Sequence, residues 1–309
     1  MVGFFNILDM YHNLSHIASQ IGFADFGAAP IKSLTQHTQR LKTYLEHNYN
    51  AGMSYLEKNI DKRDNPALLL GDDCSNGTIF CFVVPYSRAV DGTPVASFAL
   101  GIDYHSVIKQ RLRIFCSQIP LNSVHFRVFT DSAPIFERAW AVECGLGFWG
   151  CNNFFISEKV GLRCLLGIII TDIDYSLIDC EELRIKKASV KTDCGHCGNC
   201  ISKCPTGALV KPFCIDARKC ISYLTIEDKT LYSEKPISFE KNIFGCEACL
   251  RACPWDKEAD VWPELIENKD LIEGMSIADW QSLTEQEWLK YFKDSSLSRC
   301  GLKKIKNNC

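Results

Sequence analysis

The chain has 309 residues, of which 47% are hydrophobic and 23% charged, and its mean hydropathy is -0.05. This composition is typical of a globular protein with a sizeable core, and the length predicts two domains of about 150 residues each. No run of residues reaches the roughly 18 apolar positions of a membrane-spanning helix. The net charge of -3, from 34 basic and 37 acidic residues, excludes a chain that is basic over its whole surface but allows a local basic patch.

The first part of the chain has the pattern of an α/β layer domain. Its first ten residues include Asp9 and no basic segment, so we expect neither a secretory nor a twin-arginine leader, and a cytoplasmic protein. Asp131-Ser132-Ala133-Pro134 is typical of a helix start, with the helix running to about Cys144, and glycines shape the loop 144–153. Apolar periodicity predicts helices over 6–21, 32–48 and 104–118, and strands over 77–84, 95–100, 124–130 and 163–171.

The pattern changes after about residue 173. Residues 174–192 are polar and form the expected link to a cysteine-rich unit, where hydrophobic periodicity is weak and bound cofactors would organise the chain. The remainder contains Trp262, Trp280 and Trp288 and a helical pattern near 284–293, typical of a tail that packs back on the body. We therefore expect an α/β domain over 1–175, a ferredoxin-like domain over 176–258 and a helical tail over 259–309.

The chain has 18 cysteines, far more than an ordinary protein of this length. Disulfide frameworks suit short secreted chains, so metal or redox chemistry in a reducing cytoplasm is the leading explanation. In the bacterial ferredoxin pattern, the first three thiolates of a run hold one [4Fe–4S] cluster and the fourth reaches the other cluster. The chain has this pattern in Cys194-x2-Cys197-x2-Cys200-x3-Cys204-Pro205, and a stretched copy in Cys220 followed by Cys246-x2-Cys249-x3-Cys253-Pro254.

Applied to both runs, the ferredoxin rule predicts two sets of four cysteines. The first set is Cys194, Cys197, Cys200 and Cys253, and the second set is Cys204, Cys220, Cys246 and Cys249. Tetrahedral zinc also uses CxxC pairs, so a zinc-stabilised interaction module is an alternative, although two proline-terminated runs favour iron–sulfur. Among the other cysteines, Cys81 and Cys164 lie in predicted apolar strands, whereas Cys151 lies in the glycine loop and could touch a cofactor.

Several segments of the chain resemble the epoxyqueuosine reductase family, whose members are cobalamin- and iron–sulfur-dependent enzymes acting on tRNA. The string CISYLTIE over residues 220–227 is highly specific, because a protein that only carries electrons has no need of it. The matching segments are Asp103-Tyr104-His105, Asp131 to Glu137, Gly145 to Asn152, Cys204 to Ala208, Asp216 to Glu227, and Gly245 to Trp255.

The resemblance implies a reaction, a fold and a set of cofactors. The reaction is the last step of queuosine synthesis, in which the epoxide oxygen of epoxyqueuosine is removed in a tRNA anticodon loop. The α/β domain would be nitroreductase-like and would hold cobalamin against the ferredoxin-like domain. The two [4Fe–4S] clusters would pass electrons singly from an external low-potential donor to the cobalt. We expect a monomer without membrane contact.

The chain also departs from the family pattern. The glycine loop of the family usually reads Gly-Lys-Asn, whereas Cys151 stands here in place of the lysine. Glu247 and Leu250 stand where the family usually has Asp and Gln, and Asp256 stands where it usually has Asn. Some members carry a further C-terminal helical-repeat domain that helps to hold tRNA, and we expect this chain to bind tRNA without one.

Asp131 is the candidate general acid. An opening epoxide leaves a developing alkoxide that needs a proton, and Asp131 matches the aspartate of the family and follows a predicted strand, where α/β folds collect active-site groups. Free aspartic acid has a pKa of about 3.9, so burial beside an apolar corrin face would have to raise the pKa for proton donation at neutral pH. The alternative is that Asp131 only caps the helix that opens at Pro134.

The resemblance also guides the choice of binding residues. The corrin amide groups would contact Arg63, Asn152, the backbone near Phe155, and Ser222, and Tyr104 and His105 would line the pocket. A surface or capping role is the alternative for each of them. RNA phosphates would bind a basic tail with Arg299, Lys303 and Lys304 in a salt-dependent way, unless these side chains are only solvated.

Two other functions remain open from the sequence. A corrinoid reductive dehalogenase combines the same cofactors, but such enzymes usually carry an export leader. A protein that only relays electrons would need the two clusters but would have no use for Asp131, the glycine loop or the long α/β domain.

Overall fold

A four-stranded antiparallel sheet forms the centre of the protein. The structure is a computed structural model that describes residues 10–71, 74–121 and 124–309. The strands follow the order β1-β2-β6-β3, and β2 pairs with both β1 and β6, so that Phe80 lies opposite Ala28 and Ile169. Every residue of β2 is buried, as its uninterrupted apolar run predicts. The strand bounds are β1 (Asp25–Pro30), β2 (Thr78–Pro85), β3 (Phe126–Phe129) and β6 (Cys164–Thr171).

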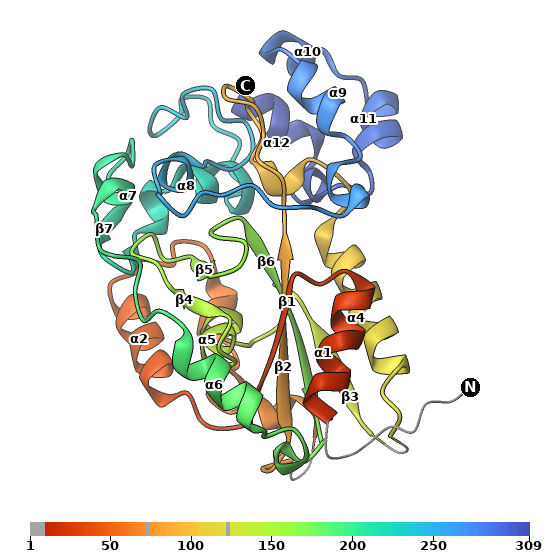
Figure 1. Cartoon of the computed structure of the whole chain (residues 1–309). Helices are drawn as coiled ribbons and strands as arrows, with labels where there is room; N and C mark the ends of the chain where they lie inside the picture. The colour runs from red at the N-terminus through yellow and green to blue at the C-terminus, as the bar shows by residue number, and fades with distance from the viewer. Residues whose placement is uncertain (1–9, 72–73, 122–123) are drawn as a thin grey trace.

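Helices cover both faces of this sheet, with α1 and α4 on one face and α2 and α5 on the other (Figure 1). Alternate residues of β2 point to opposite faces. Phe80 and Phe82 pack with Phe115 of α4, whereas Cys81 packs with Trp140 of α5 and is fully buried. The helix bounds are α1 (Met10–Ile21), α2 (Thr35–Glu46), α3 (Ile60–Asp64), α4 (Tyr104–Ser117) and α5 (Glu137–Glu143).

The glycine loop is the turn of a short hairpin formed by β4 (Gly147–Trp149) and β5 (Phe155–Ser157). The two strands approach closely at Gly147, where an added Cβ would lie 1.9 Å from the carbonyl oxygen of Ile156. A glycine is therefore required there, and the hairpin presents residues 150–154 toward the cysteine-rich segment.

The cysteine-rich segment and the C-terminal tail lie together at one end of the sheet (Figure 1). Trp280, Trp288 and Phe292 of the tail form a core with Val95 and Phe244. The helices and strands of this half are α6 (Glu181–Ser189), α7 (Asn199–Ser202), β7 (Leu209–Lys211), β8 (Cys214–Ile215), α8 (Ala248–Arg251), α9 (Lys269–Gly274), α10 (Ile277–Ser282), α11 (Glu285–Phe292) and α12 (Gly301–Asn308).

Some predicted elements are wrong. Residues 95–100 contain a short 3-10 helix, Ser97–Ala99, instead of a strand, because Val95 pairs only through a single bridge to Phe244. The helix expected from Pro134 begins at Glu137, and residues 174–192 contain α6 instead of forming only a polar link. We expected Asp131 in an active site because parallel α/β sheets collect active-site groups at the carboxyl ends of their strands. The sheet of this protein is antiparallel, so that rule does not apply to it.

Two expectations are not tested by the structure. Residues 6–9 of the first predicted helix, Asp9 included, lie outside the described residues. The predicted domain limits at 175 and 258 stay predictions. Within the described ranges, no helix is both long enough and apolar enough to span a membrane.

Candidate active site and cluster-binding cysteines

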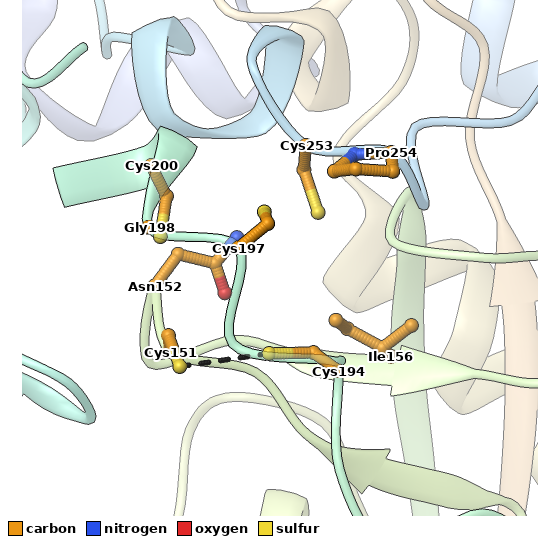
Figure 2. A pocket seen from close by; sticks show the side chains of 9 residues that line it. All are labelled: Cys151, Asn152, Ile156, Cys194, Cys197, Gly198, Cys200, Cys253 and Pro254. Carbon is orange, nitrogen blue, oxygen red and sulfur yellow. Dashed lines mark hydrogen bonds between the residues drawn. The ribbon is translucent and has the colours of Figure 1, made fainter. Parts of the chain in front are cut away.

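The four cysteines of the first set line one pocket. Cys194 and Cys197 come from the loop that leads into α7, Cys200 comes from α7 itself, and Cys253 comes from the segment after α8. Figure 2 shows their side chains around a common space, with Asn152 of the glycine loop among them. The folded chain therefore brings together the residues that the ferredoxin rule joins from both runs.

Left-handed backbone conformations shape this loop. Gly195, His196 and Gly198 have φ angles of 82°, 48° and 78°, a region in which glycine pays no steric penalty. The tight curl that results lets three cysteines close in sequence face the same side. This curl is the structural reason why cysteines separated by only two residues can face one pocket.

The cysteines of the second set are also close neighbours. Burial raises the pKa of the Cys249 thiol well above its usual value, and negative charge on Cys220 and Cys246 raises it further. Cys204 differs, because backbone N–H groups of Leu209 and Thr206 hold its pKa below the usual value although burial opposes this. Thiolates collected at such sites repel one another unless a cation neutralises them.

This donor chemistry fits an iron–sulfur cluster at each set. Thiolates are the protein ligands of [4Fe–4S] clusters, and each set supplies four of them. Bound metal deprotonates a coordinating thiol and so offsets the raised pKa values.

A buried ion network joins the second cysteine run to the sheet. Arg163 is 1% exposed, and its Nη1 lies 2.9 Å from Oε1 of Glu247, while its Nε lies 2.5 Å from Oδ1 of Asp256. Ser97 adds a hydrogen bond, with Oγ accepting from Arg163 Nη1 at 3.0 Å. The acidic residues at positions 247 and 256, where the family pattern differs, are therefore both paired with one buried guanidinium.

Asp131 lies two residues after the end of β3, with its side chain 66% exposed. Its φ of 48° is left-handed, and its carboxylate caps no helix, because α5 begins six residues later. Instead, Oδ2 accepts a hydrogen bond of 2.7 Å from the hydroxyl of Tyr104. Burial and the charge of Asp131 raise the pKa of Tyr104, so this hydroxyl stays a neutral donor.

His105 extends the contacts of Asp131. Its Nδ1 lies 2.7 Å from Oδ1 of Asp103, and its Nε2 lies 3.9 Å from Oδ2 of Asp131. Because a carboxylate can only accept, we place a proton on Nδ1, which leaves Nε2 facing Asp131. The structure thus brings together Tyr104, His105 and Asp131 through the start of α4.

Glu137 is a residue of this site that the sequence did not single out. Its Oε1 accepts a hydrogen bond of 2.6 Å from the backbone N–H of Asp131 and so supports the left-handed conformation there. Burial, together with the charge of Asp131, raises the pKa of Glu137 to about 8. Two carboxyl groups in one small region are a common arrangement for acid–base chemistry. The signal in the sequence was only that Glu137 ends the segment that begins at Asp131.

Two arginines lie near these carboxyl groups. Arg63 is 8% exposed, and its buried Nε has no hydrogen-bond partner in the described part of the chain. Arg299 pairs with Glu227 at 2.6 Å, and Glu227 and Asp131 raise its pKa although burial opposes this. An unpaired buried donor is costly, so Arg63 points to an acceptor on a bound molecule.

The other expected cofactor residues are spread more widely. Asn152 lines the pocket of the first cysteine set, and the side chain of Phe155 is buried in the core of the α/β body. Ser222 precedes a π-helix over Tyr223–Glu227, and its carbonyl oxygen accepts a hydrogen bond from Thr225. Their contacts with cobalamin stay predictions.

The expected basic tail needs a correction. Lys304 is 3% exposed, and its Nζ donates a hydrogen bond of 2.7 Å to the carbonyl oxygen of Thr230. It therefore ties α12 to a neighbouring loop and presents no charge to RNA. Lys303, the preceding residue, is exposed, and Arg299 lies beside the acidic residues described above.

Two family models match the chain. Residues 193–256 match the model of the 4Fe-4S double cluster binding domain, and residues 75–132 match that of epoxyqueuosine reductase QueG (DUF1730). The first match assigns the cysteine-rich segment to iron–sulfur clusters and removes the zinc alternative. Together the site and fold define an iron–sulfur reductase in which a double-cluster domain packs on an α/β body.

Relatives along nearly the whole chain identify the family. The epoxyqueuosine reductase of Cellulophaga algicola is 33% identical over 298 residues, which are 94% of this chain and 94% of the relative. The epoxyqueuosine reductase of Cyclobacterium marinum is 33% identical over 91% of this chain and 90% of its own. The chain belongs to the epoxyqueuosine reductase family, as its motifs predicted.

A solved structure agrees with the fold. The crystal structure of an epoxyqueuosine reductase with an epoxyqueuosine-modified tRNA-Tyr stem loop superposes with a TM-score of 0.84, at 24% identity, over 98% of this chain and 80% of that one. The predicted fold class, an α/β body followed by a double-cluster domain and a helical tail, is confirmed.

Proposed function

We propose that this chain reduces the epoxide of epoxyqueuosine in a tRNA anticodon loop, with Asp131 as the proton donor. The observation that carries the proposal is the carboxylate of Asp131, which is 66% exposed yet held by the hydroxyl of Tyr104 at 2.7 Å. Such a group is accessible to a large substrate and has a defined orientation. The names of the relatives, and the stem loop bound to a related structure, support tRNA as the substrate.

The overall reaction consumes two electrons and two protons and releases the epoxide oxygen as water. Asp131 transfers its proton to the epoxide oxygen as the first C–O bond breaks, so that no free alkoxide forms. The hydrogen bond from the Tyr104 hydroxyl holds Oδ2 toward the substrate, and Nε2 of His105 lies 3.9 Å from the same oxygen. Glu137 is a positioning residue, because it binds the backbone N–H of Asp131.

Cobalamin is the cofactor that we assign to the space beside Asp131. In its Co(I) state it supplies the reducing equivalents for the reaction. One observation supports this assignment: the buried Nε of Arg63 has no hydrogen-bond partner among the described residues. An amide oxygen of the corrin periphery would satisfy this donor, and Tyr104 and His105 would lie along the same wall.

The two clusters carry electrons to that space. Cys194, Cys197, Cys200 and Cys253 hold one cluster, and Cys204, Cys220, Cys246 and Cys249 hold the other. The common pocket of the first set supports this crossed assignment. A low-potential donor outside the chain provides the electrons, and the protein acts as a cytoplasmic monomer.

The RNA contacts involve few side chains. Lys303 and Arg299 approach the phosphates, and the ring of Tyr55, which is 48% exposed and lies within reach of the charges of Arg63 and Arg299, provides a surface for an unstacked base. The modified base leaves the stack of the anticodon loop to reach Asp131.

One reaction tests the proposal. Anaerobically reconstituted protein is incubated with cobalamin, a low-potential reductant and tRNA that contains epoxyqueuosine, and the nucleosides are analysed. We expect queuosine to form only in the complete mixture. Full retention of epoxyqueuosine by protein that contains about eight irons, as two cubanes require, would contradict the proposed activity and leave the cluster assignment intact.

A further inference from the structure

The glycine loop places two side chains against the first cysteine set. Cys151 is 4% exposed, and its Sγ lies 3.5 Å from Sγ of Cys194 and 3.6 Å from Nδ1 of His196. Asn152, the next residue, lines the same pocket and is 2% exposed. Both residues come from the hairpin turn of the α/β body, so they reach the cysteine-rich segment from outside it.

The orientation of both residues is fixed by backbone contacts. The carbonyl oxygen of Cys151 accepts a hydrogen bond of 2.9 Å from the N–H of Phe213. Oδ1 of Asn152 accepts one of 3.2 Å from the N–H of Phe154, which leaves the amide nitrogen as the group directed into the pocket (Figure 2). That nitrogen, Nδ2, is buried and has no partner among the described residues.

A buried N–H group without an acceptor is expensive and calls for one on a bound group. The lining of this pocket is rich in sulfur, and inorganic sulfide and thiolate sulfur both accept hydrogen bonds. Cys151 has the complementary property, since a thiol 3.5 Å from a ligand thiolate can only be the donor of the pair. Two independent donors therefore converge on the cluster position.

We infer that Cys151 and Asn152 are hydrogen-bond donors to the cluster held by Cys194, Cys197, Cys200 and Cys253, and that they set its reduction potential. Cys151 donates its S–H to the sulfur of Cys194, and Asn152 donates from Nδ2 to a sulfur of the cluster. Neither residue is a ligand. The inference rests on the cluster part of the proposed function and is independent of the substrate.

The effect on the potential has a definite sign. Reduction adds negative charge to the cluster, and a donor to its sulfurs stabilises the more negative state, which raises the potential. A hydrogen bond to a charged acceptor contributes enough to change an equilibrium by about tenfold. Loss of one donor should therefore lower the ratio of reduced to oxidised cluster at a given potential by about tenfold, which corresponds to about 59 mV for one electron.

Redox titration of the anaerobic, fully reconstituted protein, followed by electron paramagnetic resonance, measures both clusters in one sample. In Cys151→Ala we expect one of the two couples to move to lower potential and the other to stay in place. In Cys151→Ser, which keeps a donor, we expect a smaller shift. Asn152→Leu removes the Nδ2 donor without adding a charge, and the same couple should move in the same direction.

Cys144→Ala is the matched control. Cys144 is also fully buried at the start of the glycine loop, but its sulfur faces the carbonyl oxygen of Ile79 and not the pocket. Neither couple should move in this variant. Equal potentials in Cys151→Ala and Cys144→Ala, or a shift of both couples alike, would overturn the inference.

Two further measurements separate a donor from a ligand or a packing residue. The Fe–S stretching bands of the wild-type protein should shift in D2O, and part of that shift should be absent in Cys151→Ala. Iron content should stay unchanged in this variant. A loss of half the iron would show that Cys151 is a ligand, and an iron-free wild-type protein would overturn the cluster assignment together with this inference.

Discussion

Arg163 and Asp256 form a buried bidentate ion pair, with 2.5 Å between Nε and Oδ1 and 3.1 Å between Nη2 and Oδ2. Arg163 immediately precedes β6, in the centre of the sheet, and Asp256 follows the second cysteine run, so the pair joins the two halves of the molecule across 93 residues. Glu247 binds the same guanidinium from within that run.

Arg163→Ala should destabilise the protein strongly. The change removes the buried guanidinium that Glu247 and Asp256 share, so that only Arg251 at 3.3 Å from Glu247 and Arg88 at 3.9 Å from Asp256 remain, and breaking a buried pair costs about 3–5 kcal/mol. Urea unfolding measures the loss. Lys32→Ala is the control, because Lys32 and Glu143 form an exposed pair whose removal should cost about 1 kcal/mol or less. If both variants lost a similar free energy of unfolding, the buried network would contribute no more to stability than an exposed ion pair.

Asp131→Asn should abolish turnover while the clusters and the fold remain. General acid catalysis contributes about 10²–10⁴-fold, so the rate constant measured in a single turnover should fall by at least about a hundredfold. Tyr104→Phe removes only the 2.7 Å hydrogen bond and should lower kcat by about tenfold. Asp260→Asn, at an exposed position, serves as the control. Turnover near the wild-type rate in Asp131→Asn would remove Asp131 from the acid role.

Glu137→Gln should change how stability depends on pH. Burial raises the pKa of Glu137 to about 8, so the folded protein binds a proton there that the unfolded chain releases at a lower pH. The stabilising contribution of Glu137 is complete below about pH 4.5 and is lost as the pH rises toward about 8.

Urea unfolding at several pH values checks this expectation. Between pH 5 and 8 the wild-type protein should lose stability relative to Glu137→Gln, with a slope of no more than about 1.4 kcal/mol per pH unit for one group. Parallel curves for the two proteins would show that Glu137 titrates at its ordinary value.

Substitution of Lys303 should change tRNA binding, whereas substitution of Lys304 should change stability. Lys303→Ala removes an exposed charge, so the slope of log affinity for tRNA against log salt should become shallower by about 0.7–0.9. Lys304→Ala should leave that slope unchanged and instead lower stability by about 1–3 kcal/mol, because the carbonyl oxygen of Thr230 loses its buried donor. Filter binding over a salt series and urea unfolding distinguish the two, and a shallower slope in Lys304→Ala would show that this lysine reaches RNA after all.

Several strands, one helix and the cysteine motifs of this protein could be predicted from the sequence alone. The strands over 78–85 and 164–171 follow from continuous apolar runs, and helix α4 follows from its 3.6-residue period. The cysteine runs predict iron–sulfur ligation because the spacing of thiolates along a short loop limits which metal centres they can surround. These properties depend on neighbours in sequence, so a linear pattern contains them.

The contacts, burial and pKa values of the site residues could be learned only from the tertiary structure. Nothing in the order of residues places Asn152 in the pocket that Cys253 lines, with Nδ2 unpartnered among the described residues, or buries Lys304 while Lys303 stays exposed one position away. Glu137 acquires a pKa of about 8 only because burial and the charge of Asp131 act on it together. Burial, hydrogen-bond partners and electric fields arise between segments distant in sequence, and they exist only once packing has brought those segments together.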